Sequence, residues 1–362
     1  MKFNETVSYT PKKDYTMNKL TYKNVHNKFK LNGHHYSREE LLHIGYCYIK
    51  EGEPFEKLVG EFFIDWFDEN SFMNFQTSGT TGKPKIIKIY KQAMVNSALA
   101  TGDYFKLSPG DKTLHCLPVE YIAGKMMFVR AIILGLDMNF VEPNSHPMLK
   151  NDVKYDFTAM VPLQAQNSLK ELLLVKKMII GGAKMNMKLE KSLAKLPIDV
   201  FETYGMTETI THIAAKKIGE TAFTVLPNVT ISYDDRNCLV IHAPRISDEV
   251  IVTNDFVELI NENQFTFLGR YDNVVNSGGI KLMPEVIENK LADKINSRFF
   301  VAGKPDETLG EKLILVIEGE KQAIDDSIFE NLNKYEKPKE FLFIPKFKET
   351  DNGKIMRRET LN

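Results

Sequence analysis

The chain has few cysteines and no long apolar run, and each absence argues against a class of protein. Its 362 residues contain three cysteines, which are far apart and have no CxxC spacing. A disulfide framework and a cysteine-based zinc site are therefore not indicated. No stretch approaches the roughly 20 apolar residues of a membrane span, and the N-terminus lacks the apolar core of a signal peptide. We expect a cytoplasmic protein without a membrane span.

The chain also lacks an excess of either charge. It has 47 Lys and Arg residues against 48 Asp and Glu residues. This balance gives no general attraction to nucleic acid or to an anionic membrane, so a bound anion must meet local groups. We expect small-molecule partners and no nucleic acid, and the oligomeric state, including a homo-oligomer, stays open.

The pattern of apolar residues predicts a layered α/β domain. Segments 37–50 and 54–68 place apolar residues at helical spacing. From Met73 to Gly205, short apolar runs alternate with helical stretches. That alternation favours buried, largely parallel strands covered by helices.

The pattern changes in the last third of the chain. Residues 211–270 contain short alternating strands with turn signals, which predict antiparallel hairpins. A helix is expected to begin near Pro284, followed by strands through Ile344. The predicted fold is α/β, with a large layered domain over 1–270, its β-rich subdomain at about 211–270, and a small α+β domain over 271–362.

One segment combines hydroxyl groups, glycines and lysines in the sequence TSGTTGKPK. Glycines let backbone N–H groups approach phosphate oxygens, hydroxyls donate further hydrogen bonds, and lysine adds positive charge. It is not a Walker A loop, because Pro84 stands where that motif needs Ser or Thr. The alternative is an ordinary polar turn. The predicted phosphate-binding residues are Thr77, Ser78, Gly79, Thr80, Thr81, Gly82, Lys83 and Lys85.

This segment resembles the phosphate-binding loop of the adenylate-forming superfamily of acyl-CoA synthetases, luciferases and peptide-synthetase adenylation domains. Four further segments agree with the family in identity and order, so the resemblance covers the chain from about Phe75 to Arg358. It implies an acid–thiol ligase that uses ATP, releases AMP, and needs Mg²⁺ and coenzyme A. It also implies that the small C-terminal domain is mobile.

Two of those segments are GGA at 181–183 and YGMTET at 204–209. The resemblance implies these contacts to the nucleotide and its magnesium: Gly182, Ala183, Tyr204, Gly205, Thr207 and Glu208. Tyr204 would stack on adenine, Thr207 would contact the α-phosphate, and Glu208 would help hold Mg²⁺, which accepts carboxylate oxygens. Without the resemblance, the glycines would indicate close packing and Glu208 a surface carboxylate.

Another of these segments, from Thr253 to Asp272, resembles the family's ribose-binding pair and hinge. Asp255 and Arg270 are carried over as contacts to the ribose hydroxyls, and Asp272 matches the hinge position. Asn254 stands where the family usually has glycine.

The remaining motifs belong to the predicted small domain. Gly278 and Gly279 lie in a loop that the resemblance places next to the CoA arm after the domain rotates. A basic segment near the C-terminus contains Lys354. In the family the matching lysine bridges the substrate carboxylate and the α-phosphate, so Lys354 is the predicted catalytic residue together with Thr207 and Glu208.

The substrate prediction rests on a shorter stretch. Only 76 residues precede Thr77, and segment 117–130 resembles compact bacterial 2-succinylbenzoate–CoA ligases of menaquinone synthesis. This acid keeps a second carboxylate after activation and needs a donor for it. Tyr121, where many relatives have histidine, Gly124 and Lys125 are predicted to shape the acid pocket.

Lys125 and Arg130, at the start of a predicted helix, are candidate donors for the spare carboxylate, and ordinary surface or helix charges are the alternative. Our hypothesis assigns the role to Lys125. Other readings are an aryl- or fatty-acid–CoA ligase and a stand-alone adenylation domain that loads a carrier protein. A non-catalytic AMP-binding module is least favoured, because Lys354 and Glu208 are both retained.

Overall fold

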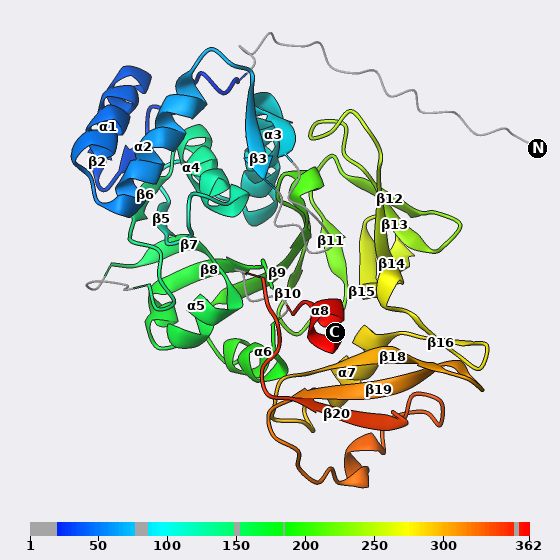
Figure 1. Ribbon diagram of the computed structural model, residues 1–362. Coiled ribbons are helices and arrows are strands. Elements are labelled where there is room, and N and C mark those ends of the chain that lie inside the picture. Colours follow the sequence, from blue (N-terminus) through cyan, green and yellow to red (C-terminus); the bar gives the residue numbers. More distant parts are fainter. Residues whose placement is uncertain (1–19, 77–85, 148–152, 184, 351–354) are drawn as a thin grey trace, which may run out of the picture.

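The computed structural model describes residues 20–76, 86–147, 153–183, 185–350 and 355–362 (Figure 1). The helices of this part are α1 (Arg38–Glu51), α2 (Pro54–Phe67), α3 (Lys91–Phe105), α4 (Ile122–Leu134), α5 (Pro162–Asn167), η1 (Glu171–Leu174), α6 (Met187–Leu193), η2 (Thr207–Thr209), η3 (Tyr271–Asn273), α7 (Pro284–Leu291), η4 (Asp326–Phe329) and α8 (Arg357–Leu361). No helix among the described residues is both long and apolar enough to cross a membrane.

A sheet of thirteen described strands forms the centre of the large domain. In spatial order they are β12 (Thr230–Tyr233), β13 (Cys238–His242), β14 (Ile251–Asn261), β15 (Gln264–Arg270), β11 (Phe223–Val225), β10 (His212–Lys217), β9 (Asp199–Gly205), β8 (Val175–Ile180), β7 (Tyr155–Met160), β5 (Lys112–His115), β6 (Asp137–Phe140), β1 (Lys30–Leu31) and β2 (His34–His35). Strands β9, β8, β7, β5, β6 and β1 run parallel, and all of them except β1 lie in the stretch for which the sequence predicts parallel strands. The mixed α/β fold class is confirmed.

The strands of the β-rich segment pair antiparallel, as predicted. They continue the large sheet, because β10 pairs with β9 through Ala215 and Thr203. A sheet edge left by β9 would expose unpaired backbone groups, and β10 satisfies them. A short hairpin of β3 (Phe72–Gln76) and β4 (Ile86–Tyr90) lies outside the large sheet.

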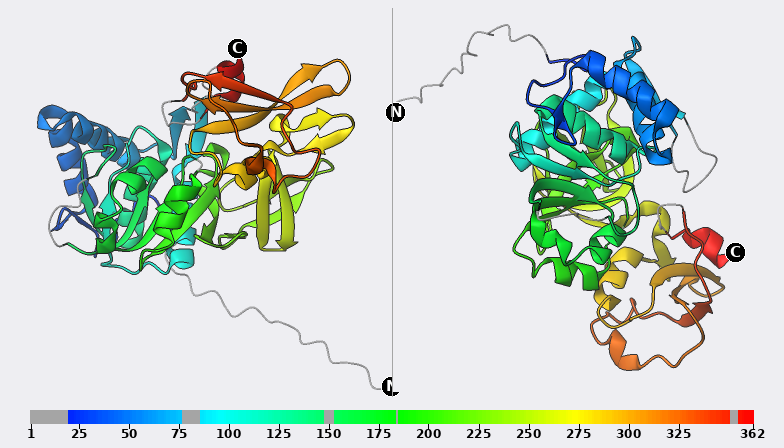
Figure 2. Two further views of the ribbon diagram at one scale, coloured as in Figure 1. Left: turned by 90° about the horizontal axis from the view of Figure 1, so that it is seen from below. Right: turned by 90° about the vertical axis from the view of Figure 1, so that its left-hand side faces the viewer.

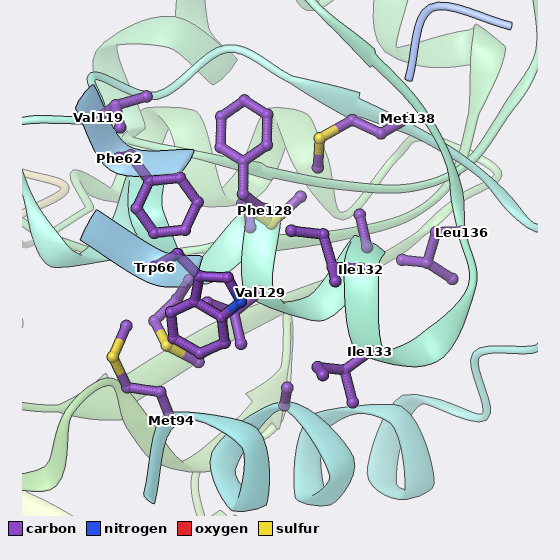
Figure 3. Packing of buried hydrophobic residues seen from close by; sticks show 14 of the residues in the cluster. Phe62, Trp66, Met94, Val119, Phe128, Val129, Ile132, Ile133, Leu136 and Met138 are labelled. Atoms are coloured by element: carbon purple, nitrogen blue, oxygen red, sulfur yellow. The ribbon is translucent and has the colours of Figure 1, made fainter. Parts of the chain in front are cut away.

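Helices cover both faces of the parallel strands (Figures 1 and 2). The two faces follow from the two-residue period of a strand: Ile179 of β8 faces the core under α3 and α4, whereas Met178 faces the core under α6. Helix α4 is apolar on almost every side and is buried accordingly. Figure 3 shows Phe62 and Trp66 of α2 packed close to Phe128 of α4, with ring centroids of Phe62 and Phe128 5.7 Å apart.

A second sheet follows the large one. It consists of β17 (Ile280–Leu282), β16 (Val275–Ser277), β19 (Gly310–Glu318), β18 (Phe299–Asp306) and β20 (Glu340–Ile344), and it has its own apolar core with α7. None of its described strands pairs with the large sheet. The change of sheet falls in η3, close to the predicted division at residue 270, and independent motion of this part stays a prediction.

Candidate active site

Three of the predicted nucleotide residues, Gly182, Tyr204 and Gly205, lie at the carboxyl ends of neighbouring parallel strands of the large sheet. Parallel strands present their carboxyl ends at the same edge, and ligands of open α/β sheets bind there. Strand β8 ends before Gly182 and β9 runs into Tyr204 and Gly205. Gly182 has φ +84°, and a side chain on Gly205 would clash with the backbone of Thr211. Close backbone approach therefore explains the glycine at 205, and a left-handed turn explains the one at 182.

Tyr204, Asp255 and Arg270 form a partly buried polar cluster between β9, β14 and β15. The Tyr204 hydroxyl donates to Asp255 Oδ2 over 2.5 Å, and Arg270 Nη1 lies 3.2 Å from Asp255 Oδ1. Burial and the neighbouring Asp255 carboxylate raise the pKa of Tyr204 above its ordinary value. Asp255 Oδ1 is buried and, although it is ion-paired with Arg270, accepts no hydrogen bond from a described residue. Such an atom is suited to accept a hydrogen bond from a ribose hydroxyl.

The residue that departs from the family's usual glycine has a clear structural role. Asn254 accepts a hydrogen bond from Arg236 Nη1 over 2.8 Å and donates from Nδ2 to Asp272 Oδ2 over 3.4 Å. Arg270 also lies 3.4 Å from the same Asp272 oxygen. The predicted hinge residue is thus held from two sides in this orientation of the small domain.

The turn between β9 and β10 carries Thr207 and Glu208. Within it, the Thr209 hydroxyl donates toward the carbonyls of Met206 and Thr211, and Ile210 has φ +66°. A positive φ is rare for a β-branched residue, and such conformations concentrate at functional sites. The sequence does not reveal this strained turn.

Glu208 is the predicted magnesium ligand, and its carboxylate is exposed in η2. Among the described residues, no group of three or more His, Cys, Asp or Glu could hold a metal ion. A single exposed carboxylate fits Mg²⁺ only as a supplement to phosphate oxygens and waters, which is how Mg²⁺ is commonly bound beside nucleotides.

The predicted acid pocket lies at the start of α4. Tyr121 is the exposed N-cap, and a Cβ on Gly124 would lie 2.1 Å from the Pro118 carbonyl oxygen, so only glycine fits there. Lys125 donates from Nζ to the Val119 carbonyl over 2.8 Å. Its ammonium is therefore already engaged within the loop that precedes the helix.

Arg130 is not the helix-start or surface charge that the sequence suggests. It lies in the middle of α4 and is 2% exposed. Its guanidinium donates to Met127 Sδ over 3.5 Å and to Thr211 Oγ1 over 3.3 Å, and no carboxylate of a described residue pairs with it. Burial lowers the pKa of Arg130 to about 9. A buried cation without an anion is unfavourable unless a ligand supplies one.

His115, at the end of β5, is a second buried polar group that the sequence does not single out. Both of its ring nitrogens lack a hydrogen-bond partner among the described residues. Burial, together with the charge of Arg130, lowers the pKa of His115 to about 3, so the ring is neutral. Arg130 Nε is likewise buried without a partner there. Native interiors rarely leave such groups unsatisfied.

Residues 56–237, about half of the chain, match the family described as "AMP-binding enzyme". The chain belongs to this family. A 2-succinylbenzoate–CoA ligase of Salmonella typhimurium is 26% identical over 84% of this chain and 71% of its own length. An acyl-CoA synthetase (AMP-forming)/AMP-acid ligase II-like protein from Dyadobacter fermentans is 34% identical in its crystal structure, with a TM-score of 0.59 over 85% of this chain and 94% of that one.

A third similar protein shares the fold at lower identity. It is the o-succinylbenzoate CoA synthetase of Bacillus subtilis in complex with its acyl-adenylate intermediate. The identity is 20% and the TM-score is 0.70, over 80% of this chain and 68% of that one. This likeness supports the adenylate-forming architecture of the AMP-binding enzyme described above.

Several predicted residues of this AMP-binding enzyme lie outside the described residues. They are Thr77, Ser78, Gly79, Thr80, Thr81, Gly82, Lys83, Lys85 and Lys354. The chain on both sides of residues 351–354 is anchored, because Glu349 pairs with Ile355 and Arg357 Nη1 lies 2.8 Å from Glu288 Oε1. Gly278 and Gly279, both with positive φ, form the exposed turn between β16 and β17. Their contact with CoA stays a prediction.

Proposed function

We propose that this AMP-binding enzyme is an acid–CoA ligase that works through an acyl-AMP intermediate. In the first half-reaction a carboxylate oxygen of the acid attacks the α-phosphorus of ATP, and diphosphate leaves. In the second, the CoA thiol loses its proton, its sulfur attacks the acyl carbonyl, and AMP leaves. Membership of the family and the ligase names of its relatives support this chemistry.

The residues divide the work between binding the nucleotide and offsetting charge. Asp255, whose Oδ1 accepts no hydrogen bond from the described residues, accepts from the ribose. Lys354 and the segment Thr77–Lys85 supply positive charge and donors where negative charge grows in the transition state. Glu208 would hold Mg²⁺, which neutralises phosphate oxygens when bound.

The proposed acid is 2-succinylbenzoate, and the observation that carries this is the buried guanidinium of Arg130, which no carboxylate of the described residues pairs with. The guanidinium contacts Thr211, at the end of the turn that carries Thr207 and Glu208. This acid keeps one carboxylate after the other is activated, and that carboxylate would neutralise the cation. A fatty acid or a simple aryl acid has no second carboxylate and would leave the buried charge unpaired.

We assign the spare carboxylate to Arg130 rather than to Lys125, because the charge of Lys125 is already favoured by nearby carboxylates such as Asp65, whereas no carboxylate of a described residue pairs with Arg130. Lys125→Ala is expected to change the KM for 2-succinylbenzoate by less than about threefold, since only an intramolecular contact is lost. Steady-state kinetics measure this. A rise of tenfold or more would return the role to Lys125.

Asp255→Asn is expected to raise the KM for ATP about tenfold, because a carboxylate accepts charge-assisted hydrogen bonds that an amide does not match. The control is 3′-deoxy-ATP and 2′-deoxy-ATP, which each lack one ribose hydroxyl. Wild-type enzyme should discriminate against them, and the variant should discriminate less. An unchanged preference for ATP would remove Asp255 from the ribose site.

The overall proposal is tested with purified protein, ATP, Mg²⁺, CoA and a panel of acids led by 2-succinylbenzoate. AMP, diphosphate and acyl-CoA are followed together. Acyl-CoA and AMP from 2-succinylbenzoate alone would support the assignment, and product only from other acids would overturn the choice of acid. AMP release that depends on a carrier protein in place of CoA would favour the stand-alone adenylation domain.

A further inference from the structure

Arg130 is the first member of a chain of hydrogen bonds that continues away from the predicted acid pocket. Its Nη2 lies 3.3 Å from Thr211 Oγ1, and that oxygen lies 3.3 Å from His212 Nδ1. On the other side of the ring, His212 Nε2 lies 3.3 Å from Thr101 Oγ1, which donates to the Ser97 carbonyl over 2.9 Å. The chain joins α4, β10 and α3, and His212 and Thr101 are buried.

The directions of these hydrogen bonds follow from the carbonyl end of the chain and from a neutral His212 ring. A guanidinium can only donate, and a carbonyl oxygen can only accept. The Thr101 hydroxyl proton goes to Ser97, so Thr101 accepts from His212, which carries its proton on Nε2. In a neutral ring Nδ1 then has no proton, so it accepts from Thr211, which in turn accepts from Arg130.

The surroundings of His212 keep the ring neutral. Burial lowers its pKa well below the ordinary value, and the positive charge of Arg130 acts in the same direction. The ring also packs edge-on against Phe105, with centroids 5.9 Å apart. The imidazole is thus held in one position and one tautomer.

We propose that Thr211 and His212 are positioning residues, which orient the Arg130 guanidinium toward the spare carboxylate of the acid substrate and so contribute to acid specificity. This inference rests on the proposed function. A carboxylate in place of His212 would orient Arg130 equally well, but it would neutralise the guanidinium and compete with the substrate. A neutral hydroxyl–imidazole pair fixes the geometry and leaves the charge available.

Positioning matters here because Arg130 has few other restraints. Besides Thr211, its only hydrogen-bond partner among the described residues is Met127 Sδ, a weak acceptor. A guanidinium that turns freely must be ordered when the substrate binds, and that ordering lowers affinity.

The test uses two matched pairs of variants. Thr211→Val removes the hydroxyl, whereas Thr211→Ser keeps it. His212→Asn places an amide oxygen near the position of Nδ1 and can still accept from Thr211, whereas His212→Gln places its amide near Nε2 and cannot. For each variant, kcat/KM is measured with 2-succinylbenzoate and with 4-oxo-4-phenylbutanoate, which has the succinyl chain but no ring carboxylate.

We expect the ratio of kcat/KM for the two acids to fall about tenfold in Thr211→Val and His212→Gln, through the KM for the diacid. Thr211→Ser and His212→Asn should keep most of the ratio. Because both acids are compared within one variant, a loss of folded enzyme does not change the ratio. An equal loss with both acids in Thr211→Val and His212→Gln would overturn the inference and leave these residues a structural role.

The same measurements separate this inference from the proposed function. If the wild-type enzyme does not prefer the diacid, the choice of acid is wrong. If Arg130→Met keeps that preference, the assignment of Arg130 is wrong. If Arg130→Met abolishes the preference but all four Thr211 and His212 variants retain it, only the positioning inference fails.

Discussion

Arg130→Met is expected to lower kcat/KM for 2-succinylbenzoate about 10- to 100-fold, because a charge-assisted hydrogen bond to a carboxylate contributes about 1.5–3 kcal/mol. The long, flexible side chain of methionine fills most of the same space in the apolar helix α4. Activity with 4-oxo-4-phenylbutanoate should fall much less, because that acid has no ring carboxylate to lose its partner. Steady-state kinetics with both acids measure the effect.

Arg130→Met is expected to lower activity without lowering thermal stability. Arg130 is buried and has no anionic partner among the described residues, so its removal should leave the melting temperature unchanged or raise it. If Arg130 stabilised the fold, its removal would lower the melting temperature. A lower melting temperature together with equal loss of activity on both acids would show that Arg130 is structural.

Lys354→Ala is expected to slow formation of acyl-AMP by about 100- to 1,000-fold, which is the usual effect of removing one preorganised donor from a site of developing negative charge. Two anions meet when the acid attacks ATP, and the lysine bridges them in the family that the chain resembles. Thioester formation from supplied acyl-AMP and CoA should remain largely intact, because the lysine has no part in that half-reaction.

The two half-reactions are measured separately. Exchange of labelled diphosphate into ATP reports adenylation, and release of AMP from synthetic acyl-AMP in the presence of CoA reports thioester formation. Lys354→Arg is the matched control, since it keeps the charge but changes the geometry. An equal loss in both assays would contradict the division of labour between the half-reactions.

Local patterns predicted most of the elements of this fold. The run DVFETYG coincides with β9, and the helix expected near Pro284 begins at that residue. The helix was predictable because proline suits the first turn of a helix. The β-rich segment was predicted as strands but not as part of the large sheet, since periodicity does not show which strand edges pair.

The sequence by itself determined the family, because membership depends on contiguous motifs such as YGMTET, whereas the nucleotide contacts of those motifs stay predictions. Only the tertiary structure decided that Arg130 is a buried cation without an anionic partner in the described part of the chain, and that Thr101, 111 residues before His212, completes its hydrogen-bond chain. What a charged side chain contributes depends on the groups that surround it in space. The order of residues does not show whether that side chain is buried or whether it has a partner.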